Sequence, residues 1–277
     1  MKRTRAVSNF WKRALSGGLF VGVVTGAIFA HPLCFYALFL LLNAAGLAEF
    51  GRLAGKMDAR VNLPLCVACG ALLFTAGFLH NYAGERYALL YLLLVIPASL
   101  LPVVELYRRG GDGFRNVSLS FHALLYISLP FALLPYLPYR VAGEWNPWII
   151  FLPFLLAWVN DTFAYLSGVR FGRHKLFPRV SPNKSWEGLV GGSVATLLAG
   201  AFLVPRVGGL TRVDTVVIAG IVVLFGVYGD LIESLFKRCA GVKDSGNFLP
   251  GHGGVLDRFD AILFAIPAIF VYLECMY

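Results

Sequence analysis

The chain is dominated by apolar runs that leave no polar face on a helix drawn through them. In residues 89–101 and 218–228 nearly every position is apolar, whereas a surface helix of a soluble protein keeps a polar stripe. Apolar runs of about 17 to 24 residues are long enough to cross a bilayer. Nine predicted spans lie near residues 14–30, 33–50, 63–79, 87–106, 117–138, 147–168, 188–205, 213–236 and 258–277.

The Lys and Arg residues predict how these spans are oriented, because positively charged loops stay on the cytoplasmic side. With the N-terminus inside, the outside loops hold only Arg86, Arg140, Arg206 and Arg212 of the 24 basic residues. We therefore expect an integral membrane protein with a cytoplasmic N-terminus. The first apolar segment also has the character of a cleaved signal peptide, but cleavage would leave the later spans oriented as before.

The composition agrees with an all-α, polytopic membrane fold. Hydrophobic residues make up 58 % of the chain and charged residues 14 %, which is about half the charged fraction of a soluble domain. The net charge of +9 does not indicate a nucleic-acid partner, because little soluble surface is available to carry a basic face. We expect a single membrane domain over 1–277, with N-terminal helices over about 14–138 and a catalytic region over about 147–277.

The five cysteines predict no disulfide framework, since their number is odd and most lie inside apolar segments. Cys66 and Cys69 form a C-x-x-C pair in an apolar run that is rich in small residues. Small residues let membrane helices approach closely, so we favour packing over redox chemistry for this pair.

Eight acidic residues lie within or at the ends of apolar segments, where an ionised carboxylate facing lipid costs at least a few kcal/mol. They are Glu49, Glu105, Asp161, Glu187, Asp230, Glu233, Asp257 and Asp260. Such residues usually face a partner, a metal ion or a water-filled cavity. For Glu49 and Glu105 we favour a simpler interpretation, in which a residue at a helix end reaches the membrane interface.

Two groups of acids predict a divalent-cation site at one membrane face. Asp230, Glu233, Ser234 and Lys237 recur at helical spacings of three and four, which places them on one face of a helix. A second stripe, at the start of the last span, holds Asp257 and Asp260. Magnesium prefers oxygen ligands and usually takes one or two carboxylates, with water and substrate phosphates filling the rest of its shell.

Two polar inside loops supply candidate phosphate ligands. Residues 237–255 combine Lys237, Arg238 and Lys243 with several glycines, which let backbone amides approach an anion. His252 in this loop is as consistent with a structural role as with contact to a phosphate or base. Residues 170–188 hold Lys175 and Lys184 beside a Pro-, Asn- and Ser-containing turn; their alternative role is to fix topology near anionic headgroups.

Residues 234–260, SLFKRCAGVKDSGNFLPGHGGVLDRFD, resemble the signature of phosphatidate cytidylyltransferases, also called CDP-diacylglycerol synthases. The positions that the signature specifies fall on Ser234, Lys237, Arg238, Lys243, Asp244, His252, Gly253, Gly254, Asp257, Arg258 and Asp260. The stretches NDTFAYLSGVRFGRHKLFPRVSPNKSWEG and GDLIES extend the resemblance over about 160–260, and AEFGRL at 48–53 adds a short N-terminal element.

The resemblance implies a nine-helix, dimeric membrane enzyme that uses CTP and phosphatidic acid, releases pyrophosphate and needs Mg²⁺, with a second, monovalent cation such as K⁺ nearby. We expect it in a bacterial inner membrane with the active site facing the cytoplasm. By position, Asp230 and Asp257 resemble the metal-binding pair. The catalytic residues implied are these two aspartates with Lys237, Arg238, Lys243 and Asp244, and the substrate-binding residues are Lys175, Lys184, Ser234, His252, Gly253, Gly254, Arg258 and Asp161.

These residues fit a reaction in which the lipid phosphate attacks the α-phosphorus of CTP while a metal ion bridges the CTP phosphates. Such a reaction requires the protein mainly to align the substrates and to neutralise their charge, rather than to supply a covalent nucleophile. Asp244 and Asp161 either complete the metal shell or hold basic residues in place. A CTP-dependent lipid kinase of the dolichol kinase type would use similar chemistry on the γ-phosphoryl group. A cation transporter is the non-enzymatic alternative, but it predicts charges throughout the bilayer depth, whereas most charges here cluster at the cytoplasmic ends.

Overall fold

The structure is a computed structural model of the whole chain, and it describes residues 2–202, 207, 209–246 and 253–277. These residues form two compact units, and each is described by itself. The first unit comprises Met1–Ala132 with Cys239–Phe259, and the second comprises Leu133–Arg238 with Asp260–Tyr277. The all-α prediction holds for the described residues apart from one short hairpin, and the single-domain prediction stays a prediction.

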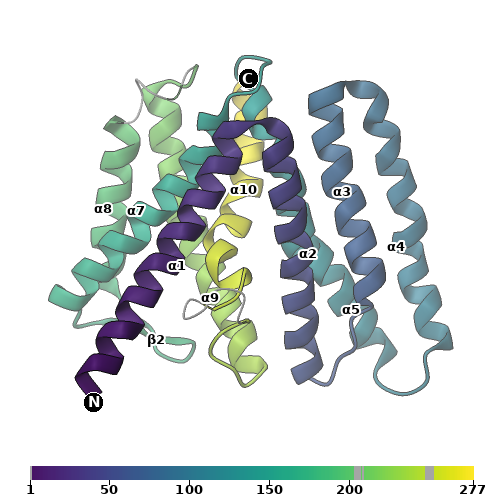
Figure 1. Cartoon of the computed structure of the whole chain (residues 1–277), viewed down its shortest axis with the longest axis horizontal. Coiled ribbons are helices and arrows are strands. Elements are labelled where there is room, and N and C mark those ends of the chain that lie inside the picture. The colour runs from purple at the N-terminus through teal and green to yellow at the C-terminus, as the bar shows by residue number, and fades with distance from the viewer. Residues whose placement is uncertain (1, 203–206, 208, 247–252) are drawn as a thin grey trace. The chain divides into compact units, whose positions relative to one another are not determined.

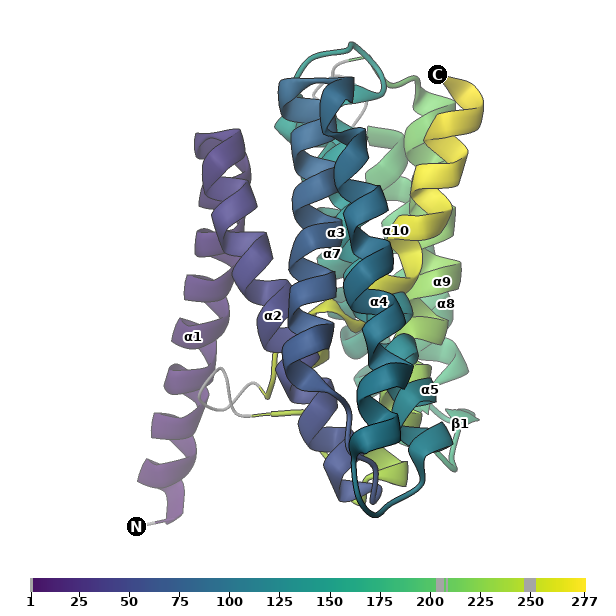
Figure 2. The same cartoon turned by 90° about the vertical axis from the view of Figure 1, so that its right-hand side faces the viewer.

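The first unit is a set of long helices from the N-terminal half of the chain (Figure 1). They are α1 (Lys2–Ala30), α2 (Pro32–Lys56), α3 (Leu63–Ala83), the 3-10 helix η1 (Glu85–Ala88), α4 (Leu89–Tyr107), α5 (Gly113–Ala123), the π-helix η2 (Leu124–Ser128) and the start of α6 (Leu129–Leu133). Helix α3 packs between α2 and α4, as Figures 1 and 2 show. Phe39, Phe131 and Phe259 form an aromatic cluster in its core, with ring centroids 5.4–6.2 Å apart.

The second unit contains the region in which the polar motifs lie. It holds the 3-10 helix η3 (Leu134–Tyr139), α7 (Pro147–Phe171), the strands β1 (Lys175–Phe177) and β2 (Ser181–Ser185), α8 (Trp186–Phe202), nearly all of α9 (Arg212–Cys239) and most of α10 (Leu256–Met276). The strands pair antiparallel, with Lys175 opposite Ser185 and Phe177 opposite Ser181. This hairpin occupies the loop that the sequence pattern left without regular structure.

Local sequence explains where several helices begin. A polar residue followed within two positions by proline starts α2, α3 and α7, and the side chains of His31, Asn62 and Asn146 accept hydrogen bonds from backbone amides of the first turn. Such residues satisfy amides that have no partner within the helix, and proline is tolerated there because it lacks an amide proton.

Glycines bring α7 and α8 close together. A Cβ atom at Gly188 would lie 2.8 Å from the carbonyl oxygen of Ala164, and one at Gly192 would lie 2.8 Å from that of Asn160. Gly188 and Gly192 are four residues apart, the spacing by which small residues allow close contact of membrane helices. This contact sets the position of the hairpin that joins the two helices.

Seven helical segments are long and apolar enough to cross a membrane within the residues that the structure describes. They are Pro32–Lys56, Leu63–Ala83, Glu85–Tyr107, Gly113–Tyr139, Pro147–Phe171, Arg212–Cys239 and Leu256–Met276. The other two predicted spans overlap shorter apolar segments, Ser16–Ala30 within α1 and Trp186–Phe202. Residues 203–205 of the predicted span 188–205 lie outside the described residues. The chain is therefore a polytopic membrane protein, and the predicted count of nine spans is not confirmed.

Candidate active site

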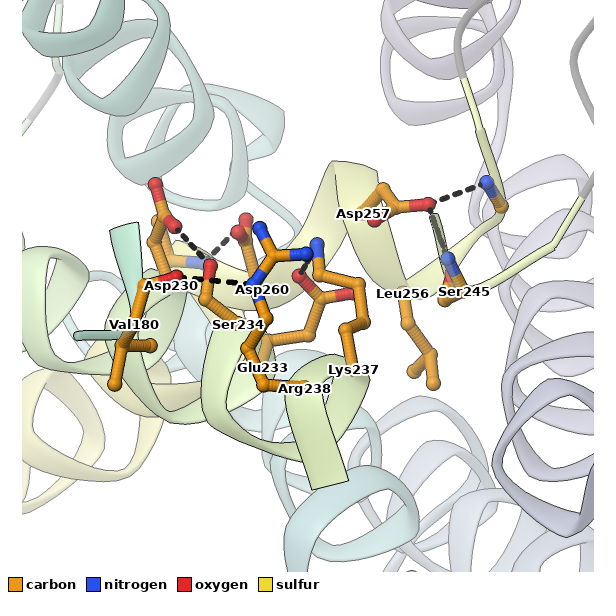
Figure 3. Close-up of polar contacts among 12 residues, drawn as sticks. Val180, Asp230, Glu233, Ser234, Lys237, Arg238, Ser245, Leu256, Asp257 and Asp260 are labelled. Carbon is orange, nitrogen blue, oxygen red and sulfur yellow. Dashed lines mark hydrogen bonds and ion pairs between the residues drawn. The ribbon is translucent and has the colours of Figure 1, made fainter. Parts of the chain in front are cut away.

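Asp230 near the C-terminal end of α9 is the centre of the polar stripe that the sequence predicts. Lys184 of β2 places its Nζ atom 2.5 Å from Oδ2 of Asp230. Ser234, one turn along α9, donates a hydrogen bond from Oγ to Oδ1 of the same aspartate at 3.2 Å (Figure 3). Two residues from separate parts of the motif, Lys184 and Asp230, are thus brought together by the fold.

The other basic residues on this part of α9 also have defined partners in the second unit. Lys237 donates to Oε2 of Glu233 at 2.5 Å, one turn earlier on the same helix. Arg238 donates from Nε to the carbonyl oxygen of Val180 at 3.2 Å, which ties α9 to the hairpin (Figure 3). Lys237 and Arg238 are therefore oriented before any ligand binds.

A close approach of α9 and α10 adds more carboxylates to the same region of the second unit. A Cβ atom at Gly229 would lie 2.3 Å from the carbonyl oxygen of Asp260, so only glycine allows this packing. Asp161, Asp230 and Glu233 lie within electrostatic range of Asp260. Four of the predicted acidic residues therefore gather in one region of the second unit: Asp161, Asp230, Glu233 and Asp260.

A cavity of about 550 Å³ opens beside the Lys184–Asp230 pair. Helix α7, the hairpin, α8 and α9 all contribute to its wall. Its polar lining includes Asn160, Asp161, Asn183, Lys184, Ser185 and Asp230, and most of the remaining lining is apolar or glycine. A volume in this range is typical of pockets that bind small molecules.

Asn160 is a polar cavity residue that the sequence analysis did not single out. It is nine-tenths buried, and its Oδ1 atom accepts no hydrogen bond from the residues that the structure describes. A buried amide without a partner costs free energy unless a ligand or water completes it. The sequence signal that could have identified Asn160 is its position next to Asp161 within the segment NDTF.

The hairpin is held against α8 by Glu187. Its carboxylate accepts hydrogen bonds from the backbone amides of Arg173 and His174 and from Nδ1 of His174, the last at 2.7 Å. Lys175, at the start of the hairpin, is exposed to solvent and does not line the cavity.

Asp257 lies in the first turn of α10, within the first unit. Its Oδ2 atom accepts two hydrogen bonds from Ser245, one from the amide and one from the hydroxyl, each at 2.9 Å (Figure 3). It accepts a third from the amide of Gly254 at 2.7 Å. Gly253 has a φ of 84°, in the left-handed region, and a Cβ atom there would lie 2.4 Å from that oxygen. The predicted glycines thus shape the backbone around Asp257.

Glu49 of α2 completes this network, and its interpretation as a helix-end residue at the membrane interface is wrong. Its side chain is only 1 % exposed. It accepts hydrogen bonds from the amides of Val255 and Leu256 and from the hydroxyl of Ser245. The position of AEFGRL in the family resemblance was the only signal that linked it to the motif region.

The remaining predicted residues occupy surface positions or lie outside the described chain. Lys243, Asp244 and Arg258 are exposed. His252 lies outside the described residues. The roles assigned to these four residues stay predictions.

Within the described parts of the chain, no group of three or more His, Cys, Asp and Glu residues is arranged to hold a metal ion. Carboxylate oxygens of the kind that magnesium prefers are nevertheless present in each unit. Asp230 belongs to the second unit and Asp257 to the first. Magnesium needs only one or two protein carboxylates when substrate phosphates and water complete its shell. The donor chemistry at each aspartate therefore suits this ion. The fold defines a membrane protein whose second unit gathers carboxylates and basic side chains beside a cavity.

Comparison with known proteins narrows this class to one family. The family model described as "Cytidylyltransferase family" matches residues 11–276. A phosphatidate cytidylyltransferase of Staphylococcus saprophyticus is 34 % identical over 261 residues, which cover 94 % of this chain and 92 % of the relative. Relatives with the same name from Staphylococcus aureus, over 263 residues, and Staphylococcus haemolyticus, over 257 residues, are each 32 % identical. The chain belongs to the cytidylyltransferase family.

Proposed function

We propose that this chain is a phosphatidate cytidylyltransferase, which transfers CMP from CTP to phosphatidic acid and produces CDP-diacylglycerol and pyrophosphate. The observation that carries the proposal is the similarity to relatives of that name over 94 % of the chain. The family match over residues 11–276 supports the same reaction class.

The reaction needs a charged site more than a covalent nucleophile. A phosphate oxygen of phosphatidic acid attacks the α-phosphorus of CTP and forms a new oxygen–phosphorus bond. The bond between the α-phosphorus and the oxygen that bridges to the β-phosphorus breaks, and pyrophosphate leaves with that oxygen. Because no proton must move, the protein contributes alignment and charge neutralisation.

Basic side chains of the motif region supply the neutralising charge in this proposal. Lys184 lines the cavity and is held by Asp230, while Lys237 and Arg238 are held by Glu233 and by the carbonyl of Val180. Side chains that are already oriented lose less conformational freedom when they bind phosphate. Together with Lys243, they are the proposed ligands of the triphosphate and of the lipid phosphate.

Asp230 and Asp257 are the proposed magnesium ligands, on the basis of the sequence resemblance and of their oxygen chemistry. The bound ion would supply positive charge to the phosphates of CTP. Asp161 and Asp244 would complete the ion's shell or orient the basic residues. The resemblance also supports a second, monovalent cation such as K⁺.

The cavity supports entry of the lipid from the bilayer. Tyr165 and Val169 of α7 line it and are 70 % and 71 % exposed, although α7 is long and apolar enough to span the membrane. In the proposal, the acyl chains stay in the bilayer beside these residues. The phosphate then reaches Lys184 at the polar wall.

The proposed topology adds Ser16–Ala30 and Trp186–Phe202 as two further spans, which makes nine. The 17 residues of α8 are at the lower limit for crossing a bilayer. The distribution of Lys and Arg supports a cytoplasmic N-terminus and active site. A homodimer in a bacterial inner membrane completes this arrangement, and it rests on the family resemblance.

The proposal is tested by incubating the purified protein in detergent micelles with CTP and phosphatidic acid, with and without magnesium. We expect pyrophosphate release that requires the lipid and the metal, together with a CDP-lipid product. Release of CDP with a newly phosphorylated lipid would instead identify a CTP-dependent kinase. Absence of CTP turnover would contradict an enzymatic function.

A further inference from the structure

Glu49 is a buried acid that the proposed reaction does not use, and it comes from a part of the chain far from the signature. We propose that Glu49 is a positioning residue that acts through Ser245 and the start of α10 to hold Asp257 in its metal-binding orientation. This inference rests on the proposed function, because it takes Asp257 as a magnesium ligand. Glu49 itself is not proposed to touch the metal or the substrates.

The contacts of Glu49 are directed at the backbone that carries Asp257. Oε1 accepts a hydrogen bond from the amide of Val255 at 2.9 Å, and Oε2 accepts one from the amide of Leu256 at 3.0 Å. These amides begin α10 (Leu256–Met276), where the first amides of a helix have no partner within it and attract negative charge. Glu49 therefore fixes the residues directly before Asp257.

Ser245 connects the two carboxylates. Its hydroxyl lies 3.1 Å from Oε2 of Glu49 and 2.9 Å from Oδ2 of Asp257. A serine hydroxyl has one proton, so the two acids share a single donor. The amide of Ser245 also donates to Asp257, as Figure 3 shows for the Ser245–Asp257 contacts. A change at Glu49 would therefore alter the hydrogen bonding of Asp257 directly.

The nearby glycines leave space for these carboxylates. A Cβ atom at Gly246 would lie 2.6 Å from Oε1 of Glu49, and one at Gly254 would lie 2.3 Å from its Oε2 atom. Arg52 forms an ion pair with Glu49 at 3.9 Å, but its side chain is 63 % exposed. The charge of Glu49 is thus stabilised mainly by the backbone of the motif region, which is what a residue dedicated to positioning that segment requires.

The test compares magnesium binding and activity in Glu49→Gln and Ser245→Ala. In the Gln variant, an NH2 group replaces one of the two acceptor oxygens. That group cannot accept the hydrogen bond from the backbone amide or serine hydroxyl that it faces. Ser245→Ala removes only the hydroxyl that links the two acids. Loss of a residue that supports a metal ligand typically lowers metal affinity or activity by about 10- to 100-fold. We expect the magnesium concentration for half-maximal activity to rise within that range for Glu49→Gln, and by a smaller factor for Ser245→Ala.

A second readout does not depend on turnover. Ligand binding to the folded state raises the thermal unfolding midpoint, Tm, so the shift of Tm on adding magnesium reports binding alone. We expect this shift to be large in the unmodified protein, lost in Asp257→Asn and reduced in the Glu49 and Ser245 variants. Glu105→Gln is the matched control, because Glu105 contacts Asn116 and Arg108 instead of the α10 backbone, and it should keep the normal shift.

The outcomes separate this inference from the proposed function. If Asp257→Asn keeps the normal shift, the ligand assignment fails and the role of Glu49 fails with it. If Asp257→Asn loses the shift while both Glu49→Gln and Ser245→Ala keep it, only the positioning role is overturned. Should Glu49→Gln fail to fold, Glu49→Asp decides the question, because it keeps the charge but is one methylene too short to reach the amides of Val255 and Leu256. A reduced magnesium-induced Tm shift in this variant supports the positioning role, and a normal shift overturns it.

Discussion

The Lys184–Asp230 pair allows a structural role and a functional role to be separated by experiment. Both side chains are partly exposed, at 29 % and 32 %. Ion pairs that contact solvent contribute at most about 1 kcal/mol to stability. Lys184→Met should therefore change the free energy of unfolding by no more than about 1 kcal/mol, because the hydrocarbon part of the side chain is retained.

The expected effect on activity is much larger. If Lys184 neutralises charge that develops on a phosphate in the transition state, its loss should lower kcat by about 10²- to 10³-fold, which corresponds to about 2.7–4 kcal/mol. Initial rates of CDP-lipid formation in mixed micelles measure kcat, and denaturant titration in the same micelles measures stability. Arg179→Gln is the matched control, since Arg179 is an exposed basic residue of the same hairpin segment and should keep normal activity.

The double variant Lys184→Met/Asp230→Asn makes the distinction sharper. If the pair only stabilised the fold, neutralising both partners would remove the unpaired charge and restore activity. If Lys184 and Asp230 act on substrate and metal, the double variant stays inactive although it folds. Retention of more than about a third of the normal rate in Lys184→Met, a change of less than about 0.7 kcal/mol in the barrier, would refute the reasoning.

Three further predictions follow from individual contacts. Asn160→Leu should leave the unfolding free energy unchanged or slightly higher, because it removes a buried carbonyl oxygen that accepts no hydrogen bond from the described residues. Activity should fall several-fold if the cavity holds substrate, and unchanged kinetics would argue against that use of the cavity. Gly254→Ala should destabilise the protein by about 1–3 kcal/mol, since its Cβ atom would lie 2.3 Å from Glu49, whereas the control Gly55→Ala, with open space around it, should not. Glu187→Gln should lower Tm, because the carboxylate accepts hydrogen bonds from the backbone amides of Arg173 and His174 and from the His174 ring. An unchanged Tm would contradict the assigned contact.

The helices could be predicted from the sequence because hydropathy along the chain is a local property. Each of the nine predicted spans overlaps a helical segment of the described residues, and seven of these segments have the length and composition of a membrane span. The hairpin was missed because its two short strands carry no strong alternation of polar and apolar residues.

The tertiary contacts of the acids could not be read from local patterns. Glu49 reaches amides more than 200 positions away in the chain, and no local pattern of its segment indicates that contact; only the family resemblance of AEFGRL linked Glu49 to the motif region. Asp214, at the other end of α9, also escaped notice; it is buried and accepts hydrogen bonds from Tyr272 and Tyr277, each at 2.6 Å. By contrast, the contact of Lys184 with Asp230 joins two residues that the motif analysis had selected for their chemistry.

The most direct test of the proposed function follows the phosphorus atoms of CTP. The purified protein is incubated with phosphatidic acid, magnesium and CTP that carries a radioactive label at either the α- or the γ-phosphorus. The account predicts that the α-label enters the lipid fraction as CDP-diacylglycerol and that the γ-label appears only in pyrophosphate. Transfer of the γ-label to the lipid, with the α-label left in CDP, would contradict it.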